Sequence, residues 1–374
     1  MNRTGLQLVS GFTRVMGMDK LIRLSGCPFI APFYHVVSDV PLPHIRHLYS
    51  YPRIKAFEQD LEQMLVHFKP VGIQEFIKRS EEWAERGKAV RHNHPGRHNN
   101  PGKHNHPGRN NSPGKHNHPG RHNHPGRQEK PAMLLSFDDG LTECHGIIAP
   151  LLKKKGIPAI FFLNNDFIDN KGLFYRYKAS LLTEQVLNDP PTLSRAAAFL
   201  RISEPQVLPL LMAVSYDQQI LLDRLARELD YSFSDYLKDR PVYMTSPQIR
   251  ELIDWGFEIG AHSMDHPQME RFEPEEVIRQ VLSSAMDLQD RFRFRIRGFA
   301  FPFSSAGIQE EAIGKIIQEG ITLFGISGIR ETGEGHFIHR IDMEKFRLPA
   351  LDTLRIKYLR YIFRKMAGRG QEQP

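Results

Sequence analysis

Two adjacent carboxylates, Asp138 and Asp139, follow directly on the apolar run 132–137 (AMLLSF). Such a run is typical of a strand buried on both faces. In α/β barrels and open sheets, the C-terminal ends of the strands host the active site. Neighbouring side chains on an extended chain point to different sides, so one carboxylate could bind a metal while the other faces a substrate. The sequence Asp-Asp-Gly also suits an ordinary turn, so this motif alone leaves both interpretations open.

Two histidines four residues apart, His262 and His266, follow a second apolar segment, 257–261. If the chain turns helically there, both imidazoles lie on one face, one turn apart, which is a spacing found in metal sites. Taken alone, the pair could also be two surface histidines. Two histidines with one carboxylate leave positions open for water and substrate, as in catalytic metal sites. Because both motifs end apolar strands, together they favour a metal site made by Asp139, His262 and His266.

The segments around these motifs alternate between expected strands and helices. Apolar runs predict strands at 28–37, 132–137, 159–163, 257–261, 297–303 and 321–327. Helical spacing predicts helices at 55–68, 147–155, 245–256 and 274–292. Thr245 suits the N-cap of the third helix, with Gln248 as its capping-box partner. Residues 172–240 contain no expected strand and are interpreted as a helical insertion. This order predicts an α/β fold with a parallel sheet or barrel and helical crossovers.

A tandem array of six hexapeptides, from RHNHPG to RHNHPG, occupies residues 91–126. It contains no apolar residue except proline, so it offers nothing to a stacked β-helix core. Proline and glycine recur every six residues and favour repeated turns. We interpret residues 91–127 as a disordered, positively charged insert rich in His, Pro and Gly. Nine of the 18 histidines lie there, so capture or delivery of a transition metal is the functional alternative.

The positive charge of the chain is local. The net charge is +7, but seven of the 50 Lys and Arg lie within residues 91–127, where there is no acid. Without these seven, 43 basic residues remain against 43 acidic ones. No basic, aromatic-interleaved face survives this subtraction, so we do not expect nucleic-acid binding.

The cysteine content and the N-terminus bear on location. The two cysteines, Cys27 and Cys144, match no paired zinc spacing and cannot build a disulfide framework, which favours a reducing compartment. The first 26 residues lack the apolar stretch of a secretory signal, and no run is long enough to span a membrane. These features favour the cytoplasm.

The motifs resemble those of the polysaccharide deacetylase family, the NodB-homology domain of carbohydrate esterase type. The segment 136–140 (SFDDG) resembles the first family motif, and 262–266 (HSMDH) resembles the second. The segment 299–303 (FAFPF) resembles the third motif in a variant that lacks arginine, and Tyr34-His35 resembles the opening of many members. The resemblance implies a family domain over 28–350, after an extension at 1–27 and before a basic C-terminal helix or tail at 351–374. Residues 91–127 and 172–240 interrupt that domain.

The resemblance implies a fold and a set of roles. The family fold is an irregular (β/α) barrel of about seven strands. Asp139, His262 and His266 would bind a divalent metal, commonly zinc. Asp138 would act as general base, and the backbone N–H of Phe303 would help to form an oxyanion hole. The implied activity is removal of acetyl groups from N-acetylated sugars or polysaccharide, by hydrolysis of carbon–nitrogen amide bonds outside peptides.

Two parts of the family pattern are not where they are expected. The arginine that orients the base in the best-known branch is replaced by Phe301, and Arg340 could reach the site from another strand end. Arg297 is a weaker candidate for this role. The acid that protonates the leaving amine is usually a late histidine, and here the nearest candidates are His339, which is favoured, and His336. For His336 and His339, the alternative is that both are surface loop residues. His145 and His35 are further candidates near the motifs, although a lone histidine beside a strand is more often structural.

Other functions remain open at the level of sequence. The missing motif arginine and the uncertain acid leave a catalytically silent barrel that binds glycan or metal as the alternative to an enzyme. A His-rich metal chaperone would depend on the array alone. The segment 354–365 (LRIKYLRYIFRK) alternates cationic and apolar residues. It is expected to be a terminal helix packed on the barrel, although a weak contact with an anionic membrane surface is a second interpretation.

Overall fold

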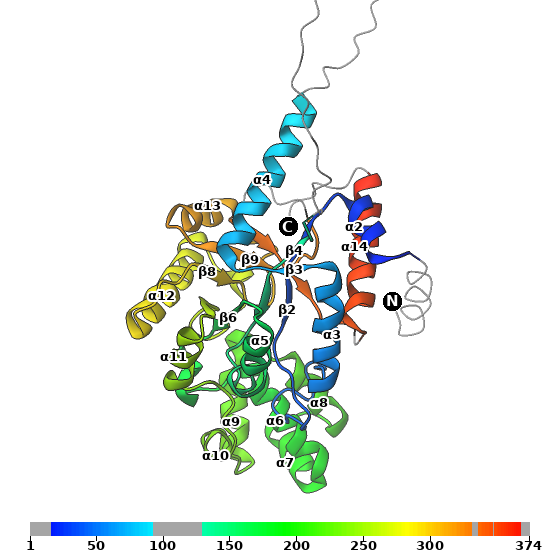
Figure 1. The fold of residues 1–374 in the computed structure, drawn as a ribbon. Helices are drawn as coiled ribbons and strands as arrows, with labels where there is room; N and C mark the ends of the chain where they lie inside the picture. Colours follow the sequence, from blue (N-terminus) through cyan, green and yellow to red (C-terminus); the bar gives the residue numbers. More distant parts are fainter. Residues whose placement is uncertain (1–15, 93–128, 331–335, 347, 368–374) are drawn as a thin grey trace, which may run out of the picture.

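The computed structural model describes residues 16–92, 129–330, 336–346 and 348–367 (Figure 1). A parallel sheet of eight strands has the order β10-β9-β8-β7-β6-β5-β2-β11. Its strands, in chain order, are β2 (Pro32–Tyr34), β5 (Leu135–Phe137), β6 (Ala159–Leu163), β7 (Glu258–Ala261), β8 (Gly298–Ala300), β9 (Thr322–Gly325), β10 (Phe337–His339) and β11 (Ile341–Asp342). A smaller parallel sheet has the order β1-β4-β3 and consists of β1 (Phe29–Ile30), β3 (Lys69–Pro70) and β4 (Ala132–Met133).

The large sheet closes on itself through the segment 337–342. Its first half, β10, pairs with β9, and its second half, β11, pairs with β2 at the opposite end of the sheet. Arg340 stands between the two halves; its N–H donates to the carbonyl of Gly325, while the N–H of Ile341 donates to that of Ala31. One bent strand therefore bridges the two edges. The expected irregular (β/α) barrel with seven strand positions is confirmed.

Aromatic residues pack β5 against its two neighbouring strands. Phe137 pairs in register with Tyr34 on β2 and with Phe161 on β6. The three rings stack across the sheet, with Phe137 centroids 6.1 Å from Tyr34 and 5.2 Å from Phe161. Phe57 of α3 covers the stack from outside, edge-on to Tyr34. This buried stack of rings fixes the position of the end of β5 relative to β2 and β6, immediately before Asp138.

Helices surround the barrel (Figure 1). The first group is α2 (Met18–Ser25), α3 (Ile54–His67), α4 (Ile73–His92), α5 (Ala149–Lys155), α11 (Ser246–Asp254), α12 (Pro274–Phe292), α13 (Glu310–Gln318) and α14 (Ala350–Met366). The N-terminus of α11 has the expected capping box between Thr245 and Gln248. The strands around residues 28–37 and 297–303 are shorter than expected.

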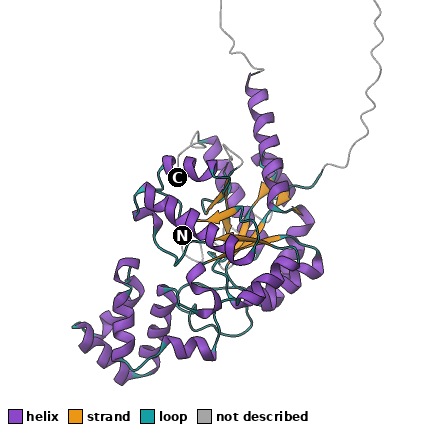
Figure 2. Ribbon diagram, turned by 90° about the vertical axis from the view of Figure 1, so that its left-hand side faces the viewer, coloured by secondary structure: helices purple, strands orange, loops and turns teal. Residues whose placement is uncertain are grey.

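A second group of helices lies between β6 and β7 and contains no strand. It is formed by α6 (Tyr175–Asn188), α7 (Pro190–Leu200), α8 (Glu204–Ala213), α9 (Ile220–Glu228) and α10 (Phe233–Asp239). Figure 2 shows these helices as a cluster projecting from one side of the barrel. They pack mainly on one another, with α6 in contact with α7, α8 and α9. The segment at 172–240 is thus helical, as its sequence predicts.

The C-terminal helix α14 packs on α2 and α3. Its inward face buries Leu354, Ile356 and Tyr358, whereas Phe363 and Met366 near its end are exposed. No helix in the described part of the chain is long and apolar enough to cross a membrane. The hexapeptide array, apart from its first two residues, lies outside the described residues.

Candidate metal and hydrolase site

The two carboxylates leave the end of β5 in different directions. The N–H of Asp138 donates to the carbonyl of Tyr34, so Asp138 still follows the barrel wall. Asp139 and Gly140 then adopt left-handed backbone, with φ of 69° and 66°. A Cβ on Gly140 would lie 2.8 Å from the side chain of Leu163 on β6, so a side chain is excluded there by backbone and by space. The turn that Asp-Asp-Gly predicts is present, and it directs both carboxylates into the barrel mouth.

The two histidines follow β7 in an irregular loop. His262 continues the sheet, because its N–H donates to the carbonyl of Leu163. Ser263 and His266 adopt positive φ of 73° and 63°, and the Ser263 hydroxyl accepts from the N–H of His266. The helical turn considered for this segment is therefore wrong. A serine-closed loop brings the imidazoles together instead, with ring centroids 4.9 Å apart.

Asp139, His262 and His266 form a buried cluster of three metal-ligand types. The Nε2 atoms of His262 and His266 lie 3.6 and 3.4 Å from Oδ1 of Asp139. One ligand atom from each residue lies within 4.8 Å of the other two. Oδ2 of Asp139 accepts a hydrogen bond of 2.7 Å from Tyr177, whereas Oδ1 has no partner among the described residues although it is buried. A buried carboxylate oxygen without a donor fits a cation at this position.

The protonation of the two imidazoles suits metal binding. Burial lowers the pKa of His262 to about 4 and that of His266 to about 3. Both rings are therefore neutral at pH 7. Nδ1 of His262 donates to the carbonyl of Ala300 at 2.7 Å, so Nε2 presents its lone pair toward Asp139. Neutral imidazole nitrogens with an ionised carboxylate are the donor set that zinc and related divalent ions take.

Asp138 is paired with Arg340. Both carboxylate oxygens accept from the guanidinium, at 2.6 and 2.8 Å, and Nη1 also donates to the hydroxyl of Ser136. Burial would raise the pKa of Asp138, but the charge and hydrogen bonds of Arg340, together with the nearby His262 and His35, hold this pKa below its ordinary value. Asp138 is therefore ionised at neutral pH and held in one orientation by a bidentate contact.

Arg340 reaches this position from the bend between β10 and β11. It is fully buried, and its guanidinium lies over the rings of Phe33 and Phe162, 4.4 and 5.2 Å from their centroids. Gly260 makes room for this arrangement, because a Cβ there would come within 2.4 Å of the Phe162 ring. Of the two arginines considered for Asp138, the structure brings Arg340 to it. Arg297 is instead paired with Glu258 at 3.4 Å.

His35 faces the same cavity from beyond β2. Its Nδ1 lies 2.5 Å from Oε2 of Glu344, whose Oε1 also accepts from the N–H of His35. Burial alone would lower the pKa of His35, but the charge and hydrogen bond of Glu344 raise it to about 10. The ring is therefore an imidazolium at neutral pH. Since Nδ1 is engaged with Glu344, Nε2 is the nitrogen left to donate a proton.

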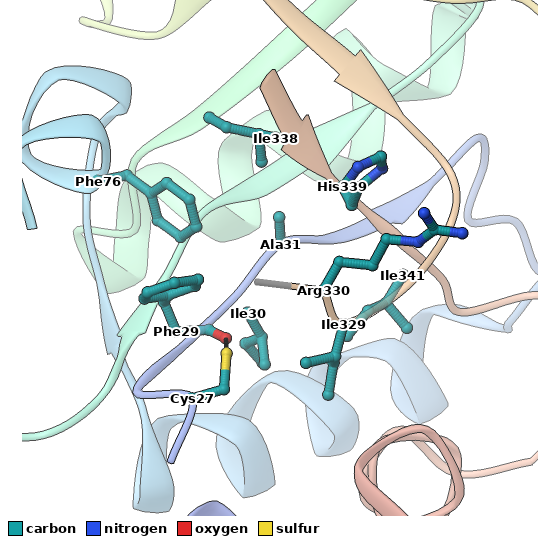
Figure 3. A pocket seen from close by; sticks show the side chains of 10 residues that line it. All are labelled: Cys27, Phe29, Ile30, Ala31, Phe76, Ile329, Arg330, Ile338, His339 and Ile341. Atoms are coloured by element: carbon teal, nitrogen blue, oxygen red, sulfur yellow. Dashed lines mark hydrogen bonds between the residues drawn. The ribbon is translucent and has the colours of Figure 1, made fainter. Parts of the chain in front are cut away.

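The other histidines weighed as acids lie elsewhere. His339 lines a separate small cavity together with Cys27, Ile30 and Ile338 (Figure 3). Successive residues of an extended chain point to opposite sides, so His339 does not share the direction of Arg340 beside it. His336 is 44% exposed and lies 3.9 Å from Glu81. His145 is paired with Glu251 at 2.8 Å and stacks on Trp255.

Phe303 lies at the rim of the cluster. It adopts positive φ of 55°, and its ring stands edge-on to His266 at 4.7 Å. No described residue accepts a hydrogen bond from its backbone N–H. A free N–H beside the three ligand residues suits a donor to a developing oxyanion.

One cavity of about 290 Å³ is lined by the residues of both motifs and by two further candidates: Asp138, Asp139, His262, His266, His35 and Phe303. The sequence motifs do not identify several of its members, which come from distant segments: Leu48, Tyr49, Phe174, Arg176 and Asp342. The sequence motifs also give no indication of Tyr177, the hydrogen-bond donor to Asp139. Three of these residues belong to the start of the helical insertion, which therefore forms part of the site. Their only sequence signal is the aromatic cluster 174–177 (FYRY), which equally suits a helix packed in the core.

Comparison with known proteins gives one family match. The polysaccharide deacetylase family matches residues 126–322, just over half of the chain, and this range includes both metal motifs. No curated protein matches. Among solved structures, the deacetylase PplD of Streptococcus pyogenes, in complex with acetate, is 11% identical, with 88% of this chain and 97% of that chain covered and a TM-score of 0.49. IcaB from Ammonifex degensii is 14% identical, with 87% and 96% covered and a TM-score of 0.47. The family match places the chain in the polysaccharide deacetylase family.

Proposed function

We propose that this protein is a metal-dependent hydrolase that removes acetyl groups from N-acetylated sugars. The observation on which the proposal rests is the buried Oδ1 of Asp139, which has no described donor and faces two neutral imidazoles. Family membership supports hydrolysis of an acetyl group on a carbohydrate. Asp138 and His35 line the same cavity as the three-residue cluster.

Asp139, His262 and His266 would hold a divalent ion, with zinc as the best match to one carboxylate and two imidazoles. When bound, such an ion supplies Lewis-acid polarisation of the acetyl carbonyl and of the attacking water. Tyr177 supports the cluster by fixing the carboxylate of Asp139, so that Oδ1 remains directed at the two rings.

The chain's own residues divide the proton transfers. Asp138, ionised and held by Arg340, accepts a proton from the water that attacks the acetyl carbon. The N–H of Phe303 donates to the oxygen that becomes negative. His35, charged through Glu344, protonates the leaving nitrogen, because a neutral amine leaves far more easily than an amide anion. The acid role thus falls to His35 in place of His339, which lines a separate cavity.

Aromatic and aliphatic side chains form the remaining walls of the cavity. Tyr49 lies beside His35, with ring centroids 4.8 Å apart, and Phe174 lies 4.3 Å from His266. Such faces suit the C–H surface of a pyranose ring, while the charged groups select the amide. An N-acetylated carbohydrate is the substrate class that this lining supports.

The first test is acetate release from N-acetylglucosamine oligomers and from simple N-acetylglucosaminides by the full chain, before and after zinc loading. We expect release that depends on the metal and stops with a chelator. Tight binding of the oligomers by the zinc-loaded protein without any release would favour the silent barrel instead.

The dependence of the rate on pH tests the role of His35. Its protonated form is the proton donor, so the rate should hold at neutral pH and fall as pH rises through about 10. Glu344→Gln removes the negative charge that raises this pKa, so the fall should move to lower pH. His35→Gln should lower the maximal rate by about 10²–10⁴-fold. Profiles of kcat for the three proteins provide the measurement, and an alkaline limb unmoved in Glu344→Gln would contradict the assignment.

A further inference from the structure

The charged groups of the cavity nearly all have partners within the chain. The carboxylate of Asp138 is paired with the guanidinium of Arg340 behind it, and the imidazolium of His35 is paired with Glu344. Oδ1 of Asp342 accepts from the backbone N–H groups of Glu344 and Lys345. With Asp139 assigned to the metal, these groups require no further counter-ion.

Arg176 is the exception among the described lining residues. It lies in the first turn of α6 and is only partly buried, between Tyr175 and Tyr177. No carboxylate of the described residues forms an ion pair with it. Tyr177 beside it bonds Asp139, and Phe174 before it packs on His266, so the backbone of Arg176 is held close to the metal cluster. Its position at a helix N-terminus adds partial positive charge in the same place.

We propose that Arg176 binds an oxyanion carried by the substrate, so that the preferred substrate is an N-acetylated sugar with a phosphate or carboxylate group. A guanidinium offers a planar fork that matches either group with two parallel hydrogen bonds. Tyr175 is the only side-chain hydrogen-bond partner of Arg176 among the described residues. A neutral glycan would leave this cation without an anionic partner, whereas an anionic sugar provides one. This inference rests on the proposed function and narrows its substrate class.

The test compares four small substrates: N-acetylglucosamine 1-phosphate, N-acetylglucosamine 6-phosphate, the uronic acid of N-acetylglucosamine, and the neutral methyl glycoside. The zinc-loaded wild-type protein should show a higher kcat/KM for at least one anionic sugar than for the methyl glycoside. Arg176→Gln should lower that ratio by about 10- to 100-fold, mainly through KM, and Arg176→Lys should recover part of it. The two phosphates and the uronic acid separate phosphate from carboxylate recognition.

Arg224→Gln is the matched control, because Arg224 is an exposed arginine of the same helical insertion and does not line the cavity. Its ratio should equal that of the wild type. Equal kcat/KM for anionic and neutral sugars, or a ratio unchanged in Arg176→Gln, would overturn the inference while leaving the deacetylase itself intact.

If no acetate is released, calorimetric measurement of the binding of the same sugars separates the oxyanion site from the proposed hydrolysis. Tighter binding of an anionic sugar that is lost in Arg176→Gln would support the oxyanion site and reject only the hydrolysis. Equal affinity for anionic and neutral sugars, without release of acetate, would reject both the oxyanion site and the hydrolysis.

Discussion

Replacing Asp138 with asparagine is expected to lower acetate release by about 10²–10⁴-fold while leaving zinc stoichiometry unchanged. The amide cannot accept the proton of the attacking water. It keeps the size of the carboxylate and lies outside the three-residue cluster, so the metal ligands stay in place. Steady-state rates with metal analysis of the same samples provide the measurement. Full activity in Asp138→Asn would show that the base is another group.

This substitution also disturbs a buried ion pair, so stability has to be measured alongside activity. Arg340 is fully buried, and an amide can satisfy only part of its bidentate contact. Leaving such a charge uncompensated costs about 3–5 kcal/mol of unfolding free energy. The double variant Asp138→Asn/Arg340→Met removes both charges and should recover much of this loss without recovering activity. A double variant that is stable and active would contradict the role of Asp138.

Asp139→Ala and His262→Ala are expected to lose zinc binding and acetate release together. Each removes one of three ligand atoms, and the remaining two cannot hold a divalent ion in a site with open positions for water and substrate. Zinc content after dialysis and the rate of acetate release are the two readouts. In His262→Ala, the carbonyl of Ala300 also loses its hydrogen bond, so thermal unfolding should be recorded for each variant.

His145→Ala serves as the matched control for histidine removal. His145 lies near the first motif in sequence, but it is paired with Glu251 and stacked on Trp255 outside the cavity. Its zinc content and activity should equal those of the wild type. Retention of stoichiometric zinc by a well-folded Asp139→Ala protein would reject the proposed ligand set.

The sequence determined the barrel and the grouping of Asp139, His262 and His266. Both depend on local signals, because apolar runs of strand length mark the buried strands and the polar motifs follow at once. Parallel strands of a barrel bring their C-terminal ends to one face. It can therefore be predicted, without knowledge of the loop geometry, that motifs far apart in sequence lie close together. The predicted helical turn at residues 262–266 was wrong, yet the two histidines still come together with Asp139.

Only the tertiary structure decided which groups complete the site. Arg340 contacts Asp138 because the last strand bends there to close the barrel, and His339 beside it must point elsewhere. His35 becomes an imidazolium through Glu344, which lies 309 residues away in sequence. Tyr177 and Arg176 enter from a helical insertion whose sequence suits an ordinary packed helix. These contacts depend on side-chain direction across closed strands and on burial, which periodicity and spacing along the chain do not record.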